Sequence, residues 1–490
     1  MISVCAIAAA VIVGASVGAS VGSSGSGTPF WSWAGTYDTA PAYNGFHGGI
    51  WASQNISEGS FDFDWKADLR FREAVDGQYG IFPSEIFASA RWKVLELDLG
   101  IRHKERSFES AGGFLGTYSL SGGNIVQSGN ARSYPGYTLK LNPLAIPFTQ
   151  GRVRIRGTFG DYKSFDNSVI SGFLIHNTEG YLDVDLTRNL TLTLGFDHYT
   201  QWGGTDEDGQ ARSTSFSNYL RMLVGKSAAD GSYPGGDVEN SLGNHLGREL
   251  VRLQYKTDLC TFSLQYDKPH EDKSGLLYRN FPDGIWTLAA EFSDPKAWIS
   301  GVVYEFQTTM YQGGDCERRP ATQQEIDSGS NHLYHNADGS WSYICGGADN
   351  YFNNYDYTSG WTNYGRVIGS PLFYVNGSHE GCVALPLACI ESNRIVAHHL
   401  GITGMLFGKA PYKFLCTYSR HHGIYESLTW MPHVPDYGTD DGTGLWQLSS
   451  AFVCEVPLGR VLNLTGGIYL DCGDCLPRNY GATVGIRIAL

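Results

Sequence analysis

The sequence predicts an all-β protein, a transmembrane antiparallel outer-membrane β-barrel with a small helical plug. Two observations lead to this prediction. Several segments alternate apolar and polar residues with the period of a β-strand. The chain joins these segments by tight turns at some points and by long polar stretches at others. Strands of this kind build a wall with one face for lipid and one face for a wet interior.

Residues 480–490 show the alternation most clearly. Tyr480, Val484 and Ile488 belong to an unbroken apolar face, which Ala482, Ile486 and Leu490 complete. The opposite face holds Gly481, Thr483, Gly485 and Arg487. An apolar row backed by small and charged residues suits a strand between lipid and water. We expect this last strand to close the barrel by pairing with a strand near the N-terminus.

Two further pairs of segments predict hairpins. Leu182–Leu186 and Leu190–Phe196 alternate on either side of a three-residue turn, and Val251–Tyr255 and Cys260–Tyr266 flank the turn Lys256–Leu259. Turns this short are typical of the periplasmic side of a barrel. Thr308–Trp361 is rich in Gly, Asn, Asp, Tyr and Ser and has no strand period, which predicts a long surface loop.

Composition agrees with one large barrel. The chain has 490 residues, of which 42% are hydrophobic and 17% are charged, so it is not a disordered chain. No Pro/Ser-rich linker or charge run divides it after about residue 28, and we predict one domain over 28–490. At roughly 10 residues a strand, about 16 to 18 strands use fewer than half of the residues and leave the rest for loops and a plug.

The net charge of −14 excludes a general nucleic-acid-binding role, because phosphate binding needs a basic patch. Arg152, Arg154 and Arg156 share one strand face. They form either a local basic site for acidic sugars or part of a charged lumen in which inward carboxylates balance them, and we expect the second.

Residues 1–27 are predicted to be a secretory signal peptide. The segment holds the longest apolar run, Val4–Val13, followed by small residues. It departs from the usual pattern because the first basic residue is Lys66. No other segment approaches the roughly 18 apolar residues that a membrane helix requires.

One interior segment has helical rather than strand periodicity. Phe216, Tyr219, Leu220, Leu223 and Val224 follow an i, i+3, i+4 pattern, with serines before them and a glycine after them. This pattern predicts an amphipathic helix too short to span a bilayer. We expect it inside the barrel mouth or beneath it, as part of the plug.

The ten cysteines are scattered, and three pairings remain open: Cys316 with Cys345, Cys382 with Cys389, and Cys472 with Cys475. A lone C-x-x-C without a second ligand pair is poor evidence for zinc or redox chemistry. We therefore expect neither a metal nor a cofactor.

A set of motifs resembles the capsule assembly protein Wzi family, particularly its Bacteroidetes-type members. The most specific motif is Ser359–Leu372, and the others are Gln201–Gly204, Leu242–Gly247, Asp283–Trp286, Tyr304-Glu305 with Gln312, Asp349–Asn354, Asn393-Arg394 and His399–Ile402. The resemblance covers the chain from Pro29 to Leu490. It implies an 18-stranded barrel with a helical plug in the outer membrane of a Gram-negative bacterium. It also implies a lectin that holds capsular or other surface polysaccharide.

Candidate site residues follow from the chemistry of sugar binding. Aromatic faces contact pyranose rings, and amides and arginines bind hydroxyls and acidic groups. We expect polysaccharide contacts from Trp361, Tyr364 and Arg366, and from the preceding group Asn350, Asn353, Asn354 and Tyr355. For any single residue of these groups, capping of loop or plug backbone is an alternative role. The motif residues whose expected role is in the plug are Trp202, Asn244, His245, Asp283, Trp286 and Glu305.

Two other functions remain as alternatives. A porin or saccharide channel needs an open lumen, which the helix 216–224 argues against. A hydrolase built on His245, Asp283 and Glu305 lacks a recognisable catalytic motif, so we expect no enzyme. Adjacent histidines, as in His398-His399 and His421-His422, point to opposite strand faces and do not converge on a metal. Expected partners are polysaccharide and the lipid and lipopolysaccharide of the membrane, with the protein as a monomer.

Overall fold

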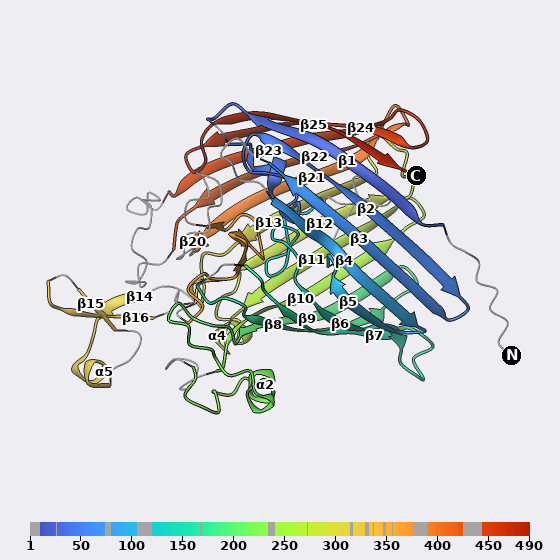
Figure 1. The fold of residues 1–490 in the computed structure, drawn as a ribbon. Coiled ribbons are helices and arrows are strands. Elements are labelled where there is room, and N and C mark those ends of the chain that lie inside the picture. Colours follow the sequence, from blue (N-terminus) through green and yellow to red (C-terminus); the bar gives the residue numbers. More distant parts are fainter. Residues whose placement is uncertain are drawn as a thin grey trace.

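The computed structural model shows a closed β-barrel (Figure 1). It describes residues 10–25, 27–73, 80–104, 120–166, 169–233, 241–271, 273–313, 317–328, 333–336, 338–345, 349–354, 356–375, 390–424 and 443–490. Eighteen strands form one sheet in which every neighbouring pair is antiparallel. The sheet closes because the last strand, β25 (Asn479–Ala489), pairs with the first, β1 (Ile12–Gly22).

The other barrel strands, in chain order, are β2 (Gly45–Glu58), β3 (Phe61–Arg72), β4 (Gly80–Trp92), β5 (Leu95–Ile101), β6 (Pro135–Ala145), β7 (Val153–Lys163), β8 (Leu174–Asp185), β9 (Leu190–Trp202), β10 (Asn244–Lys256), β11 (Cys260–His270), β12 (Gly284–Phe292), β13 (Gly301–Thr308), β21 (Ile395–Leu406), β22 (Ala410–His421), β23 (Leu445–Pro457) and β24 (Leu462–Gly473). The smaller strands are β14 (Glu317–Pro320), β15 (Leu333–His335), β16 (Trp341–Cys345), β17 (Thr362–Asn363), β18 (Arg366–Val367), β19 (Tyr374–Val375) and β20 (Ile390–Ser392). The helices are α1 (Phe30–Trp33), α2 (Phe216–Leu223), α4 (Lys273–Leu276) and α5 (Gln323–Ser328).

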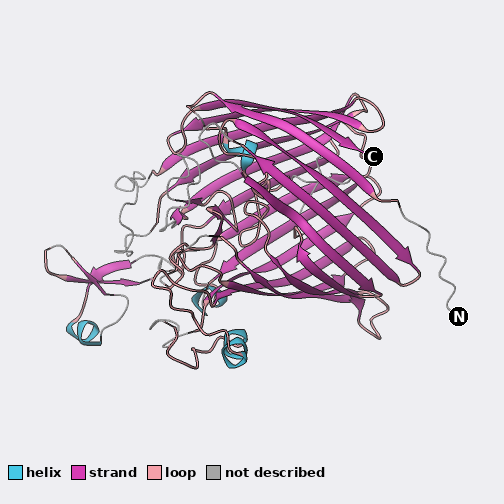
Figure 2. Cartoon of the chain, in the orientation of Figure 1, coloured by secondary structure: helices cyan, strands magenta, loops and turns pink. Residues whose placement is uncertain are grey.

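The two ends of the barrel differ in their connections. Tight turns such as 59–60 and 186–189 lie at one end, and long segments such as 203–243 and 309–394 lie at the other. We assign the short-turn end to the periplasm and the long-loop end to the cell exterior. The small sheet of β14, β15 and β16 stands clear of the barrel at the long-loop end (Figure 2).

The two-faced strands of the sequence prediction are confirmed. In β25 the side chains of Val484, Ile486 and Ile488 are exposed, whereas Thr483 and Arg487 on the other face are half-buried. The hairpins β8–β9 and β10–β11 form with the predicted turns. Within the described residues, no helix has the length and apolar character needed to cross a membrane.

The barrel extends into the segment 1–27 that is predicted as a signal peptide, because β1 lies inside these residues. This strand pairs with β2 on one side and with β25 on the other. Val13, Val17 and Val21 are exposed on its outer face, and glycines and serines alternate with them. The alternation has the period of a β-strand, although many of its residues are small. The run of small residues that resembles a processing zone is therefore part of the strand that closes the barrel. Residues 1–9 lie outside the described part of the chain.

The position of β1 gives a prediction for Val17→Arg. Val17 lies in the middle of β1 with half of its surface exposed on the lipid side. A basic residue at the bilayer midplane lowers the free energy of unfolding of a barrel by about 2–4 kcal/mol. Urea titration of the protein folded into vesicles measures this loss, and Val17→Ile serves as the control. Strand β1 is not part of the folded barrel if Val17→Arg has no effect, or if the intact mass of the membrane-bound protein shows that residues 12–22 are missing.

A plug fills part of the lumen, but it is built mainly from loops. Helix α1 is fully buried and contacts β23, β24 and β25. Its Phe30 N–H donates to Asp471 Oδ2 at 2.7 Å. Segments 120–131 and 351–375 pack with α1 into one apolar cluster, and backbone bonds such as Ser128 N–H to Ile368 O at 2.8 Å tie the two segments together.

The prediction that the helix near 216–224 belongs to the plug is wrong in placement. The helix itself is confirmed: α2 begins after Ser215, whose side chain accepts a hydrogen bond from Asn218 N–H. However, α2 lies beside the long-loop ends of β8 and β9, outside the contour of the barrel (Figure 1). Its apolar side chains Phe216, Leu220 and Val224 are exposed rather than buried in the lumen.

Candidate functional site: a cation-lined cavity in the lumen

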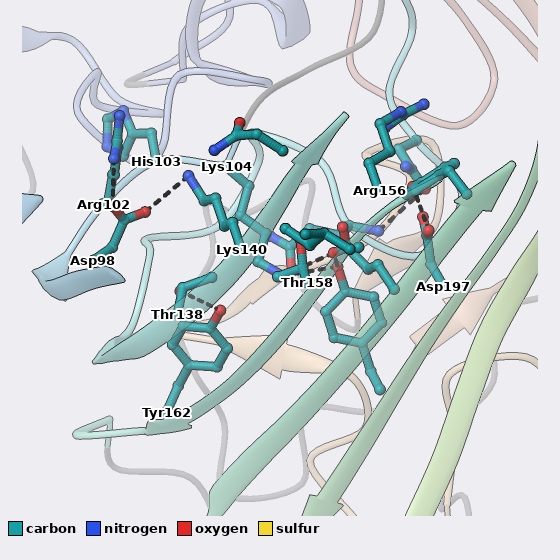
Figure 3. Close-up of a pocket in the computed structure, with 18 of the residues that line it drawn as sticks. Asp98, Arg102, His103, Lys104, Thr138, Lys140, Arg156, Thr158, Tyr162 and Asp197 are labelled. Carbon is teal, nitrogen blue, oxygen red and sulfur yellow. Dashed lines mark hydrogen bonds and ion pairs between the residues drawn. The ribbon is translucent and has the colours of Figure 1, made fainter. Parts of the chain in front are cut away.

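A cavity with a volume of about 410 Å³ lies against the inner wall of the barrel (Figure 3). Inward side chains of β5 to β10 form its wall, and Asn124 and Gln127 from the plug segment 120–131 also contribute. This volume is within the usual range for small-molecule sites, roughly 300–1,000 Å³. The described structure therefore combines a plug with a polar recess beside it.

Cations dominate the surface of this cavity. The side chains of Arg102, Lys104, Lys140 and Arg156 are between 25% and 34% exposed. Their carboxylate partners Asp98, Glu179 and Asp183 are only between 5% and 17% exposed. These three carboxylates are less exposed than their cations, whereas Asp64, which lies 3.6 Å from Arg102 and does not line the cavity, is 30% exposed. A ligand in the cavity therefore meets guanidinium and ammonium groups first.

Tyr162 and Tyr181 bring half-buried rings to the cavity, whereas the ring of Tyr199 is buried behind it. The guanidinium of Arg156 lies 4.0 Å from the centre of the Tyr181 ring. Tyr162 Oη and Thr138 Oγ1 are 2.7 Å apart, and Tyr199 Oη donates to Glu179 Oε1 at 3.1 Å. An aromatic ring and polar groups in fixed positions are two features of sugar-binding sites.

Lys104 reaches the cavity from the segment after β5. Its ammonium group donates to Glu179 Oε1 at 3.2 Å and also contacts Asn177 and Tyr199. Burial by itself lowers the pKa of Lys104, but Tyr162 and Glu179 outweigh burial and raise the pKa above its ordinary value. Lys104 therefore stays charged at neutral pH.

A serine, a histidine and a glutamate meet at the edge of the cavity. Ser84 Oγ lies 3.1 Å from His103 Nε2, and His103 Nδ1 lies 3.8 Å from Glu85 Oε2. The second distance is too long for a hydrogen bond that orients a base. Glu85 is bound by Lys66 at 2.5 Å, and Ser84 is buried. This geometry suits charge balance in the wall better than nucleophilic catalysis.

The residues proposed from the sequence for polysaccharide contact lie elsewhere, and most are buried. Trp361 is completely buried and its Nε1–H donates to Val126 O at 2.7 Å. Arg366 is buried against Asp38 and the ring of Trp33. A sugar cannot stack on a side chain without an exposed face. The prediction that Trp361 and Arg366 bind polysaccharide is therefore corrected: both hold the plug together.

The asparagines of the same segment also have structural roles. Asn350 Oδ1 accepts from Asn353 Nδ2 at 3.1 Å and from Asn393 at 2.6 Å. Asn354 Oδ1 accepts from two backbone N–H groups, and its Nδ2 donates to Asn244 Oδ1 at 3.2 Å. These contacts are the capping role considered as the alternative. Tyr364 keeps a partly exposed ring beneath Arg132, and Tyr355 lies outside the described residues.

The motif residues divide between the plug and the outer wall. Glu305 accepts from Ser121 and from Gly122 N–H, each at 2.6 Å, and Asn244 contacts the plug through Asn354, so both anchor the plug. Trp202 and His245 share their strand face with lipid-exposed residues and do not enter the lumen. Trp286 stacks on Tyr266 with 4.0 Å between ring centres.

Other predictions about reactive side chains have mixed outcomes. His398 is exposed and His399 is buried, which confirms that adjacent strand histidines diverge. Within the described residues, no group of three or more His, Cys, Asp or Glu side chains is placed to hold a metal ion. Cys472 and Cys475 are free thiols, so the pairing proposed for them is wrong. The other two proposed pairs involve side chains outside the described residues.

Asp283 gives a prediction for pH. It is fully buried, and the N–H groups of Tyr311 and Gln312 and the hydroxyl of Tyr351 donate to it. Burial raises its pKa to about 6 against these donors, from the ordinary value of 3.8. The folded state therefore binds the proton more tightly than the unfolded state. The resulting stabilisation is complete below pH 3.8 and is lost as the pH rises through 6, a change of about 3 kcal/mol.

The prediction is tested by comparing the wild type with Asp283→Asn. Urea midpoints measured at pH 4.5 and pH 7.5 give the stability difference for each protein. We expect the difference to shrink in Asp283→Asn, because the amide does not titrate. An unchanged difference would show that other groups cause the pH dependence.

Sequence reasoning missed the cavity because its lining comes from six strands. One signal was visible: Arg152, Arg154 and Arg156 share a face, and the expected inward carboxylates do balance Arg154 and Arg156. Arg154 pairs with Asp185 at 2.6 Å and Arg156 with Asp183 at 3.2 Å. The strand period therefore reveals a charged lumen, but not which parts of it remain open beside the plug.

Fold and cavity together define an outer-membrane β-barrel of a Gram-negative bacterium with a partly plugged lumen. No protein-family model matches the sequence. A comparison with curated protein sequences also finds no match. Among solved structures, the fold is similar to that of Wzi, described as a carbohydrate-binding β-barrel involved in group 1 capsule assembly in Escherichia coli. The TM-score is 0.54 at 13% identity, over 97% of this chain and 84% of Wzi.

Two other similar structures are those of Pseudomonas aeruginosa proteins. OccK5 has a TM-score of 0.45 at 9% identity, over 98% of this chain and 97% of that one. OccK2, solved in complex with glucuronate, has a TM-score of 0.44 at 9% identity, over 99% and 96% of the two chains. At 13% identity, the similarity to Wzi shows the fold alone.

Proposed function

We propose that this protein is a saccharide-binding outer-membrane barrel that helps hold capsular or other surface polysaccharide at the cell and does not cleave it. The observation that carries the proposal is the cavity beside the plug, which is lined by partly exposed cations and half-buried tyrosines. Its chemistry suits sugars that carry carboxylate or other acidic groups, because arginine and lysine bind these groups with charge-assisted hydrogen bonds. The carbohydrate binding ascribed to Wzi, which shares the fold, supports the same function.

The absence of cleavage is part of the proposal. The cavity carboxylates Asp98, Glu179 and Asp197 are each bound by a lysine or an arginine, at distances from 2.5 to 3.2 Å. General acid catalysis of glycoside hydrolysis needs a carboxyl group that is protonated and free to donate. Each of these carboxylates is occupied by its cation and is not free to donate a proton, so this set suits binding.

The test is Arg156→Gln, assayed with an oligosaccharide of hexuronic acid. Arg156 is the most exposed cation of the four, and its removal deletes a charge-assisted hydrogen bond of about 1.5–3 kcal/mol. We expect the dissociation constant to rise about tenfold or more in isothermal titration of the purified protein. A neutral oligosaccharide of the same length is expected to bind more weakly to the wild type and to lose less affinity in the variant.

Arg154→Gln is the matched control. It lies on the same face of the same strand and loses an equivalent ion pair with Asp185, but it does not line the cavity. If Arg154→Gln and Arg156→Gln lose the same affinity for the oligosaccharide, the binding site lies elsewhere in the lumen. If the wild type binds no acidic saccharide, or if it shortens the polymer, the proposed function is wrong.

A saccharide channel is the second candidate, because the cavity runs along the lumen wall. It reaches from Lys104 at the long-loop side of β5 to Asn142 near the periplasmic end of β6. Planar-bilayer recording separates the two functions. A binding protein with a docked plug gives low conductance that the hexuronate does not change. Steady, large conductance that the hexuronate blocks would favour the channel.

A further inference from the structure

A polar belt lies on the outer face of the barrel at the long-loop ends of β6 to β11. The register shows that its residues face outward: Tyr137 pairs with Asp161, Asp161 with His176 and His176 with Thr200. Further along the outer faces of β6 and β9 the side chains are apolar and exposed: Leu139 lies two residues beyond Tyr137, and Phe196 and Leu194 lie four and six residues from Thr200. Polar and ionisable groups in this position would be costly to leave against hydrocarbon.

Helix α2 covers part of this belt from outside. Tyr219 Oη donates to Asp161 Oδ2 at 3.0 Å, and its ring packs edge-on to His176, with 5.9 Å between centres. On the same side of α2, Met222 is buried together with the outward-facing Trp202. The connection between β9 and β10 therefore folds outward over the rim of the barrel, whereas the plug segments fold inward.

The rest of α2 presents an apolar face that points away from the barrel. Phe216 is 74% exposed, Leu220 47% and Val224 65%, and Leu223 lies beside them. These residues fall at i, i+4, i+7 and i+8 and form one stripe, opposite the buried Asn218 and Met222. Lys226 is exposed just beyond the end of the helix.

The surroundings of α2 identify what covers this face. The helix lies radially outside the wall, level with the strand ends where outward residues change from apolar to polar (Figures 1 and 2). That level corresponds to the boundary between acyl chains and head groups of the outer leaflet. A short amphipathic helix with a basic residue at its edge is suited to this boundary.

We propose that α2 is a membrane-surface anchor: Phe216, Leu220, Leu223 and Val224 insert among the acyl chains of the outer leaflet, and Lys226 meets the anionic head groups. The anchor holds the connection between β9 and β10 over the polar belt. It shields Asp161 and His176 from lipid and fixes the outer rim of the barrel in the membrane.

Photocrosslinking tests the anchor directly. p-Benzoylphenylalanine is placed at Phe216 or Leu220 in the full-length protein, which is folded into vesicles of phosphatidylethanolamine and lipopolysaccharide. Heat-modifiable migration confirms that each variant forms the barrel. We expect mass spectrometry to find lipid adducts at both positions, with at least fivefold higher yield than at Ser340. Ser340 is the control because it is exposed in the sheet that stands clear of the barrel.

Proteolysis gives an independent readout. In the same vesicles, the double variant Phe216→Ser with Leu220→Ser is expected to be cut by trypsin after Lys226 at least ten times faster than the wild type. Thr214→Ala, outside the apolar stripe, is expected to behave like the wild type. The proposal fails if lipid adducts at Phe216 and Leu220 do not exceed those at Ser340, if the adducts are with protein, or if the serine variant is cut at the rate of the wild type.

Discussion

Replacement of Asp38 by asparagine is expected to release the plug while the barrel stays folded. Asp38 is buried and is bound by three arginines: Arg72 on β3, Arg132 at 2.8 Å and Arg366 at 3.2 Å. These arginines come from the wall and from two plug segments. Without the carboxylate, three guanidinium groups remain close together with no counter-charge from Asp38. Breaking a buried ion pair in this way lowers the free energy of unfolding by about 3–5 kcal/mol.

Asparagine is the informative replacement at this position. Asp38 has a φ angle of 58°, in the left-handed region that asparagine tolerates better than other non-glycine residues. Asp38→Asn therefore changes the charge with little change in backbone strain. The measurements are the urea midpoint and the single-channel conductance, which is expected to rise when the plug leaves the lumen.

The control for Asp38→Asn is Asp62→Asn. Asp62 pairs with Arg91 at the surface, and a solvent-exposed pair contributes little to stability. We expect the Asp62 variant to match the wild type in both measurements. If Asp38→Asn also matches the wild type, the three-arginine cluster does not hold the plug.

The same carboxylate predicts how the plug responds to acid. Burial raises the pKa of Asp38, but Arg72, Arg366 and Arg132 together outweigh burial and hold the pKa below its ordinary value of 3.8. A lowered pKa means that the stabilisation is present above pH 3.8 and is lost as the pH falls below it. Acid is therefore expected to raise the conductance of the wild type. The conductance of Asp38→Asn is not expected to rise further in acid.

Replacement of Trp361 by alanine is expected to have a similarly large effect on stability. The indole is fully buried in the plug cluster and lies 5.8 Å from the Tyr199 ring on the barrel wall, measured between ring centres. Truncation of a buried aromatic residue to alanine lowers the free energy of unfolding by about 3–5 kcal/mol. Urea titration measures this loss, and conductance reports whether the plug has moved.

Trp361→Phe separates a structural role from a binding role. Phenylalanine keeps most of the buried volume and loses the bond to Val126 O, which we expect to cost about 1–3 kcal/mol. Hexuronate affinity should stay within twofold of the wild type, because Trp361 does not line the cavity. A large loss of affinity with an intact plug would restore Trp361 as a sugar contact.

The sequence by itself determined the barrel, because a strand between lipid and water leaves a period-2 pattern in consecutive residues. The pattern in 480–490 and in the two hairpins was sufficient for this prediction. The same rule applied to Ile12–Gly22 would have revealed β1, but its small residues resemble a processing zone when hydrophobicity alone is considered. Helix α2 was likewise predicted, because its period is local.

Only the tertiary structure decided where the loops go and which side chains they bury. The motif around Trp361 looked like a sugar-binding loop, since aromatic, amide and arginine side chains serve equally well in recognition and in a hydrogen-bonded plug. The sequence predicted a helix at 216–224 but not that its apolar face points outward, because an amphipathic period does not say what lies against it. The cavity is assembled from strands β5 to β10 and a plug segment, so its cations become neighbours only when these strands pair in the sheet.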